Sequence, residues 1–396
     1  MKREELRIEW QLVLMGSVEI MEEESEKFIE IFEQKFDWSE VIFQLVTHRT
    51  LNMFYYNIKK YNLTKKLEKE IERLMESQWA VYSQRNSYYF NELTKVSNKF
   101  IQNNLKVPVL KGNILASLVY PTIETRIFND LDMLIQLSDA QAVTKALEEE
   151  GFVQGHYDEE KNIIVEATRK EKMLQQMASH ELQEFQKIGD NPFVKLVQAD
   201  VNHDVLWKGN CPYSIPTSEL IERAIMVEVN GQETCMLEYI DNIIQLSCHL
   251  FKEATLMMWI TDLRDLKIYK FADLYSYIRK FYNEINWDEL ITRVKGYGVK
   301  KIVYYNFHFI EMMFGELIPK NVLDAIKPED LTYLDQYGIE NKEPSTWKYD
   351  FFTRLFDTNR VLEIEDAQCH NISRFIEAKI ENDGVMNIGR VVSREE

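Results

Sequence analysis

Two segments, VLKG at residues 109–112 and RIFNDLDMLI at residues 126–135, decide the fold of this chain and what it can bind. The second segment places Asp130 and Asp132 one residue apart at the start of an apolar run. Alternate residues of a β-strand lie on one face, so the two carboxylates would point the same way. Adjacent carboxylates repel unless a cation lies between them, and oxygen ligands of this kind suit Mg²⁺, which leaves positions open for water and substrate phosphates. The pattern therefore indicates phosphoryl or nucleotidyl transfer.

A third carboxylate stands in a later apolar segment, LVQADVN at residues 196–202. Two-metal phosphoryl-transfer sites hold their ions about 3.5–4 Å apart, which favours a third carboxylate beside the first two. Asp200 is flanked by apolar residues and is the natural partner of Asp130 and Asp132 if the two strands are neighbours. Asn202 would share its face. An Asp-x-Asp pair alone is weak evidence, but the order strand, Lys-Gly turn, helix, Arg, Asp-x-Asp strand and later Asp strand is more specific.

The chain of 396 residues divides by pattern into three parts. Residues 1–100 have helical periodicity and almost no Gly or Pro. Residues 101–237 alternate short apolar strands with helices and end in a hairpin signal at Asn230-Gly231. Residues 238–396 are again mostly helical. We therefore expect an α+β fold, predominantly helical overall, with a mixed β-sheet core between helical N- and C-terminal regions.

Composition limits the partners and the location of the protein. The net charge is −18, from 47 basic and 65 acidic residues, which disfavours duplex DNA because affinity for DNA comes from neutralising phosphates. No stretch approaches the roughly 20 apolar residues of a membrane helix, and the charged N-terminus does not resemble a signal peptide. The four cysteines lack zinc-ligand spacing and are expected to be free thiols. We expect a cytoplasmic protein without a membrane partner.

The order of these motifs resembles the uncharacterised nucleotidyltransferase family of the polymerase-beta superfamily, over roughly residues 40–320. Members show a Leu-Lys-Gly turn, an arginine ahead of an acidic Asp-x-Asp strand, and a later strand with an acidic residue. Here these are Leu110-Lys111-Gly112, Arg126, residues 130–134 and Asp200. The resemblance implies a mixed sheet with helices, a Mg²⁺–NTP site, and transfer of a nucleoside monophosphate.

The resemblance also implies roles for the three aspartates. Asp130 and Asp132 would hold two Mg²⁺ ions, with Mn²⁺ as the alternative metal. Asp200 would hold the ion that activates the acceptor hydroxyl, and would take its proton. Catalysis would then consist mostly of positioning and electrostatic stabilisation, as in phosphoryl transfer generally.

The same resemblance implies four residues that bind the triphosphate. Backbone N–H groups that follow Gly112, at a helix N-terminus, would surround the phosphates, and Asn113 would donate a further hydrogen bond. Lys111 and Arg126 would neutralise the phosphate charge, the arginine through its bidentate fork. A competing interpretation pairs Arg126 structurally with Glu124 or Asp130.

Several other polar residues are expected not to contact the metal ions or the nucleotide directly. Asn202 and His180 are candidates for a supporting layer, although Asn202 stands where the family usually has His and cannot titrate near neutral pH. His180 with Glu181 could form a lid over the site or an ordinary helix cap. His249 is expected to be a core histidine of the helical half. Asp262 and Asp265, which flank Arg264, are expected to form a structural ion-pair network and not to be ligands.

The sequence supports two functions. The first is a metal-dependent nucleotidyltransferase that moves an NMP from an NTP, with ATP the first candidate because it is abundant, to a hydroxyl group and releases pyrophosphate. Its acceptor could be a small molecule, a protein or peptide, or a tRNA. The alternative is a catalytically inactive binding or scaffold protein with the same fold, which the asparagine at position 202 favours.

Overall fold

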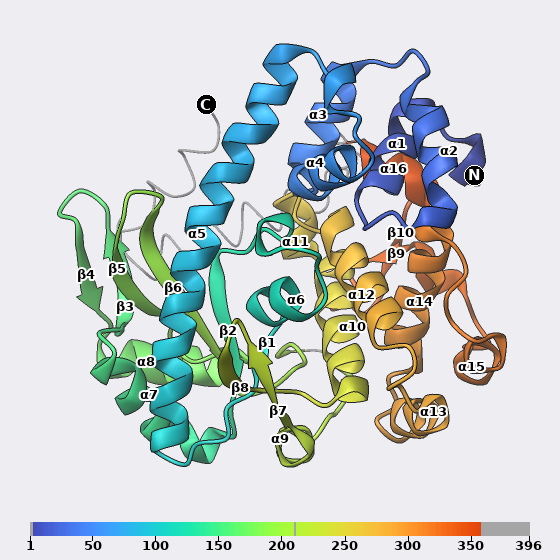
Figure 1. The fold of residues 1–396 in the computed structure, drawn as a ribbon. Coiled ribbons are helices and arrows are strands. Elements are labelled where there is room, and N and C mark those ends of the chain that lie inside the picture. The colour runs from blue at the N-terminus through green and yellow to red at the C-terminus, as the bar shows by residue number, and fades with distance from the viewer. Residues whose placement is uncertain (1–2, 210, 358–396) are drawn as a thin grey trace.

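The computed structural model describes residues 3–209 and 211–357 of the chain (Figure 1). Within these residues a mixed eight-stranded sheet is combined with helices that make up most of the described fold. The expected α+β class, predominantly helical with a mixed sheet between helical regions, is therefore confirmed. Residues 358–396, which the sequence assigned to the helical C-terminal region, lie outside the described residues. The exact division at residues 100 and 237 stays a prediction.

The helices before the sheet form the first helical region. They are α1 (Ile8–Gly16), α2 (Glu22–Phe32), α3 (Trp38–Thr47), α4 (Leu51–Lys60) and the long α5 (Lys69–Gln102). The helices after the sheet are α10 (Tyr239–Thr255), α11 (Met257–Thr261), α12 (Ile268–Lys280), α13 (Trp287–Gly296), α14 (Lys300–Phe314), α15 (Lys320–Ile326) and α16 (Phe351–Phe356). Buried side chains of α1, α4, α10, α12, α14 and α16 form one hydrophobic core, so the two helical regions stabilise each other. None of the helices in the described residues is both long and apolar enough to cross a membrane.

The sheet has the strand order β4-β3-β5-β6-β2-β1-β8-β7. Its strands are β1 (Val109–Leu110), β2 (Asp130–Leu134), β3 (Val153–Asp158), β4 (Ile163–Glu166), β5 (Phe185–Asn191), β6 (Val194–Asn202), β7 (Ile225–Val229) and β8 (Gln232–Met236). The pairs β2–β6 and β1–β8 are parallel and the other pairs are antiparallel. The predicted hairpin is confirmed: Asn230 and Gly231, with φ values of 49° and 79°, connect β7 to β8.

One face of the sheet is buried under two helices, α5 and α7 (Ala140–Glu149), and Figure 1 shows α5 running across the sheet. Leu131 and Met133 of β2, with Ala199 and Val201 of β6, pack in the same core as α5 and α7. Because side chains alternate along a strand, the aspartates between these residues point to the opposite face. That face is turned toward α10 and α12, whose residues line a cleft together with Asp130 and Asp132.

Three further helices connect strands: α6 (Gly112–Leu118), α8 (Arg169–Ala178) and α9 (Thr217–Arg223). The first of them begins directly after β1, where the chain turns at Lys111. A Cβ atom at position 112 would lie 2.8 Å from the Cβ atom of Phe128. Glycine is therefore needed for the turn to approach the strand that carries the aspartates.

Candidate active site

Three aspartates come together because β2 and β6 are neighbours, as the sequence suggested. In the parallel register Asp132 lies opposite Asp200, and Asp130 lies opposite Gln198. Asp130 and Asp132 share a face because they are two residues apart on one strand. The spacing within a strand and the register between strands therefore place the three carboxylates on one side of the sheet.

Burial and neighbouring carboxylates raise the pKa values of Asp130 and Asp200. For Asp130, burial and the charge of Asp132 raise the pKa to about 6, although Lys111, Arg126 and Arg49 act in the opposite direction. Burial and the charges of Asp132 and Asp130 hold the pKa of Asp200 well above its usual range. Bringing like charges together in a partly desolvated place is costly. The geometry therefore calls for additional positive charge at this edge of the sheet.

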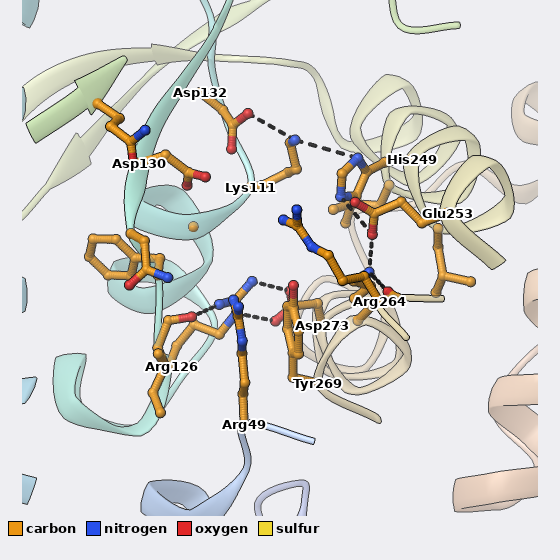
Figure 2. A pocket seen from close by; sticks show the side chains of 18 residues that line it. Arg49, Lys111, Arg126, Asp130, Asp132, His249, Glu253, Arg264, Tyr269 and Asp273 are labelled. Atoms are coloured by element: carbon orange, nitrogen blue, oxygen red, sulfur yellow. Dashed lines mark hydrogen bonds and ion pairs between the residues drawn. The ribbon is translucent and has the colours of Figure 1, made fainter. Parts of the chain in front are cut away.

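Lys111 supplies one of these charges. It sits between β1 and α6 with φ at 48°, a conformation rare for residues other than Gly and Asn. Its Nζ atom lies 2.8 Å from Oδ1 of Asp132 and 3.5 Å from Nδ1 of His249. Figure 2 shows Lys111 between these two side chains. The turn that the sequence identified thus carries its lysine straight to the aspartate pair.

The aspartates form one wall of a cleft of about 210 Å³, and helices form the facing wall. The sheet side consists of the Lys111-Gly112 turn, Asp130, Asp132 and the segment that leads into β2. The helical side is built by α10, by α12 and by Arg264 in the connection between α11 and α12. A third contribution comes from Arg49, which follows α3 in the first helical region. The cleft therefore lies where the sheet and both helical regions meet.

Arg126 lines this cleft, but its guanidinium is held by Asp273 of α12. Nε and Nη2 of Arg126 donate to Oδ1 and Oδ2 of Asp273, each at 2.6 Å, and Nη1 donates to the carbonyl of Ile127. Tyr120 donates to the same carboxylate at 2.7 Å. Burial opposes the charge of Arg126, yet Asp273 outweighs it and raises the pKa of the arginine. The suggested partners Glu124 and Asp130 are thus wrong, because α12 brings a better-placed carboxylate.

His249 is a second departure from expectation. It lines the cleft instead of the helical core, with Nε2 at 3.5 Å from Oε2 of Glu253 one helical turn later. Burial and the neighbouring charges of Lys111 and Lys252 keep its pKa well below the usual value, so the ring is neutral. Glu253 in turn pairs with Lys270 of α12. A histidine within an apolar helix carries no sequence signal that distinguishes these two environments.

The comparisons with known proteins agree with this geometry. The sequence model of a family described as an uncharacterised nucleotidyltransferase matches residues 34–315. The chain belongs to this uncharacterised nucleotidyltransferase family. Among curated proteins, none matches the chain.

Among solved structures, a similar one is the crystal structure of an antigenic nucleotidyltransferase-like protein from Paracoccidioides brasiliensis. The sequence identity is 11%, and the match covers 60% of this chain and 97% of that one. The TM-score of this match is 0.28.

In this member of the nucleotidyltransferase family, His180 and Glu181 lie beside β6. Glu181 forms a β-bridge with Asn202, so the pair does not cap a helix. Nε2 of His180 lies 3.1 Å from Oε1 of Glu181 and 3.0 Å from Nζ of Lys252. Burial works against ionisation of Glu181, but His180 and Lys252 lower its pKa to about 2. This charged group adjoins the aspartates, because Glu181 also contributes to the raised pKa of Asp200.

Asn202 and Asn113 occupy buried positions in this member of the family. Nδ2 of Asn202 donates to the carbonyls of Met133 and Asp200, at 3.2 and 3.4 Å, and so links β2 to β6. Asn113 is fully buried, and its side-chain amide has no hydrogen-bond partner among the described residues. Within the same residues the cleft lining includes Gly112 and not Asn113. Asn202 thus supports the strands, and the predicted contact between Asn113 and a phosphate stays a prediction.

Proposed function

We propose that this protein transfers a nucleoside monophosphate from an NTP, with ATP the first candidate, to a hydroxyl group of an acceptor and releases pyrophosphate. The family supports nucleotidyl transfer in general. The observation that carries the finer proposal is the register of β2 and β6, which sets Asp132 opposite Asp200 with Asp130 on the same face. Asp130 and Asp132 line a cleft that also holds the Lys111-Gly112 turn, and Asp200 lies beside them on β6.

The donor set fits a divalent cation, Mg²⁺ or Mn²⁺, held by Asp130, Asp132 and Asp200. Carboxylate oxygens are the ligands that such ions prefer. The pKa values of Asp130 and Asp200 are raised by burial and by neighbouring carboxylates, and a bound cation would lower them by offsetting this repulsion. Among the described residues, no three side chains of His, Cys, Asp or Glu lie close enough together to share one ion. In this structure the ammonium group of Lys111 forms an ion pair with Asp132 and supplies the positive charge next to that carboxylate. Bound metal ions would stabilise the charge of the transferred group and activate the attacking hydroxyl.

In the proposed reaction, Asp200 acts on the acceptor hydroxyl, and Lys111, the turn at Gly112 and Arg126 act on the nucleotide. The acceptor oxygen forms a bond to the α-phosphorus, while the bond from the α-phosphorus to the oxygen bridging to the β-phosphate breaks. The hydroxyl proton passes to Asp200, and the bridging oxygen leaves with its electron pair as part of pyrophosphate. Lys111 leaves its ion pair with Asp132 and binds a phosphate oxygen instead. Backbone N–H groups after Gly112 bind further phosphate oxygens. Arg126, fixed by Asp273, lines the space that the nucleotide fills.

The proposal is tested by incubating the protein with each of the four α-labelled NTPs, Mg²⁺ and candidate acceptors from the three classes. We expect one NTP to give labelled product and an equal amount of pyrophosphate, and the Asp130→Asn/Asp132→Asn variant to give neither. Asp139→Asn is the matched control, because Asp139 lies directly before α7 and its carboxylate accepts a hydrogen bond from Ser138 outside the cleft. Pyrophosphate release that persists in the double variant would overturn the assigned site.

One observation favours the alternative, a catalytically inactive binding protein. The Lys111–Asp132 ion pair and the Arg126–Asp273 fork satisfy two cleft cations within the chain itself. An inactive protein would bind an NTP in calorimetry and still release no pyrophosphate with any acceptor. Label transfer to any acceptor would exclude it.

A further inference from the structure

The charged side chains of the cleft fall into a paired group and an unpaired group. Three cations are neutralised by carboxylates of the cleft itself: Lys111 by Asp132, Arg126 by Asp273 and Lys270 by Glu253. Arg49 and Arg264 line the same cleft and form no ion pair with any carboxylate of residues 3–209 and 211–357. Figure 2 shows both among the side chains of the cleft, with Arg264 on the helical side. Two arginines of the cleft are thus free of ion pairs among the described residues, although the charge of Arg49 acts on Asp130, which also lines the cleft.

Aromatic rings support both arginines without neutralising them. Cζ of Arg264 lies 4.8 Å from the centre of the Trp259 ring. Cζ of Arg49 lies 5.5 Å from the centre of the Tyr269 ring, and Cζ of Arg126 lies 4.6 Å from the same ring. Two guanidinium groups therefore share one ring, with the carboxylate of Asp273 engaged by only one of them. Stacking fixes the plane of a guanidinium and leaves its N–H groups free to bind an anion.

The backbone at both arginines departs from the pattern of the other helices. Several helices end in a Schellman motif, whose left-handed residue is usually Gly or Asn. Here that residue is Asn or Gly after four helices: Asn62, Asn104, Gly151 and Gly298. After α3 it is Arg49 with φ at 57°, and after α11 it is Leu263 with φ at 53°, directly before Arg264. Unfavourable backbone conformations of this kind concentrate at functional sites.

We propose that Arg49 and Arg264 bind the β- and γ-phosphates of the nucleoside triphosphate, an inference that rests on the proposed nucleotidyl transfer. A triphosphate is the polyanion that this reaction brings to the cleft, and the other basic side chains lining it are held by carboxylates. Negative charge grows on the leaving pyrophosphate as the bond to the α-phosphorus breaks. Two unpaired guanidinium groups at that end stabilise the charge as it develops. The first helical region is thereby part of the active site.

Binding of inorganic tripolyphosphate to the full chain tests this inference without requiring turnover. Calorimetry is done without Mg²⁺ at physiological ionic strength, where the Debye length of about 8 Å restricts the effect to nearby charges. We expect Arg49→Gln and Arg264→Gln each to weaken binding about tenfold or more, because each removes a charge-assisted contact. Arg73→Gln, on the exposed surface of α5 outside the cleft, removes the same charge and should leave the affinity unchanged.

Arg49→Gly separates the role of the side chain from folding. Glycine adopts φ near 57° without strain, so we expect an equal or higher Tm together with the loss of tripolyphosphate affinity. Asn104→Gly is the matched control, because it occupies the same position of a Schellman motif after α5, outside the cleft. It should leave tripolyphosphate binding unchanged.

The outcomes separate this inference from the proposed function. If the wild-type protein fails to bind tripolyphosphate, or if both arginine variants bind it as the wild type does, the inference is overturned, and pyrophosphate release can still establish nucleotidyl transfer. If binding depends on the two arginines but no NTP releases pyrophosphate, the anion site stands and the proposed reaction fails. A loss of affinity that Arg73→Gln shares would also overturn the inference.

Discussion

The two walls of the cleft are built in different ways. The sheet wall takes Asp130 and Asp132 from five consecutive residues of β2, and their relative position follows from strand geometry alone. The helical wall takes His249, Arg264 and Asp273 from three separate places in the second helical region. A wall encoded within one strand can be read from the sequence, whereas a wall assembled from distant segments exists only after the helices have packed.

The walls also differ in how their charges are satisfied. On the sheet wall like charges gather, and the pKa values of Asp130 and Asp200 are raised. On the helical wall opposite charges are paired, as in the fork between Arg126 and Asp273. Repulsion between the carboxylates of the sheet wall therefore destabilises the metal-free fold, and a bound cation would reduce it. The ion pairs of the helical wall stabilise the fold. Substitutions should have opposite effects on stability on the two sides.

The largest effect is expected for Asp200→Asn on the sheet wall. We expect product formation to fall by about 10³-fold, because a charged group that stabilises the transition state is lost. Because the folded state disfavours the charged form of Asp200, the same change should raise the Tm of the metal-free protein at pH 7. Turnover assays and thermal unfolding on one preparation check both results. A lower Tm would contradict the inference that repulsion at Asp200 destabilises the metal-free fold.

On the helical wall, Asp273→Asn should instead destabilise the fold by about 3–5 kcal/mol, because it leaves the buried guanidinium of Arg126 without its counter-charge. Denaturant unfolding measures this difference. Asp241→Asn serves as the comparison: Asp241 is also buried and binds Arg223 at 2.7 Å and Arg293 at 2.9 Å, but these residues are not among those lining the cleft in the described chain. Both variants should be destabilised, and only Asp273→Asn should also alter nucleotide binding beyond its effect on folding.

The pH dependence of stability gives a smaller and more specific effect. The folded-state pKa of Asp130 is about 6 and its ordinary value is 3.8, so the folded state binds a proton more readily than the unfolded state does. Stability of the metal-free protein should therefore rise as the pH falls from 7 through 6 toward 4. Asp130→Asn should lack this part of the rise, which thermal unfolding across that range will show. Identical pH profiles for the two proteins would contradict the assigned pKa shift.

The smallest effect is expected for Asn202→Ala, between the two strands of the sheet wall. The change removes buried hydrogen bonds to the carbonyls of Met133 and Asp200 and should cost about 1–2 kcal/mol. Product formation should remain within a few-fold of wild type, because Asn202 supports the strands and is not assigned to the chemistry. A loss as large as that of Asp200→Asn would move Asn202 into the catalytic set.

Much of the fold could be predicted because its signals are local. The Asn230-Gly231 turn, the strands that carry Asp130, Asp132 and Asp200, and the helical runs on both sides follow from spacing and turn residues. The strand β5 and the helix α8 had no comparable signal. The sequence also could not reveal that the first helical region shares a core with the second, because that contact joins segments far apart in the chain.

By itself, the sequence determined that Asp130 and Asp132 share a face, that a Lys-Gly turn precedes them, and that Asp200 follows on a later strand. Each of these depends on the geometry of a few consecutive residues. Only the tertiary structure decided that Arg126 would pair with Asp273, that His249 would line the cleft, and that Arg49 and Arg264 would form no ion pair within residues 3–209 and 211–357. The physical reason is that the balance of charge in a buried site depends on which distant side chains packing brings within a few ångströms.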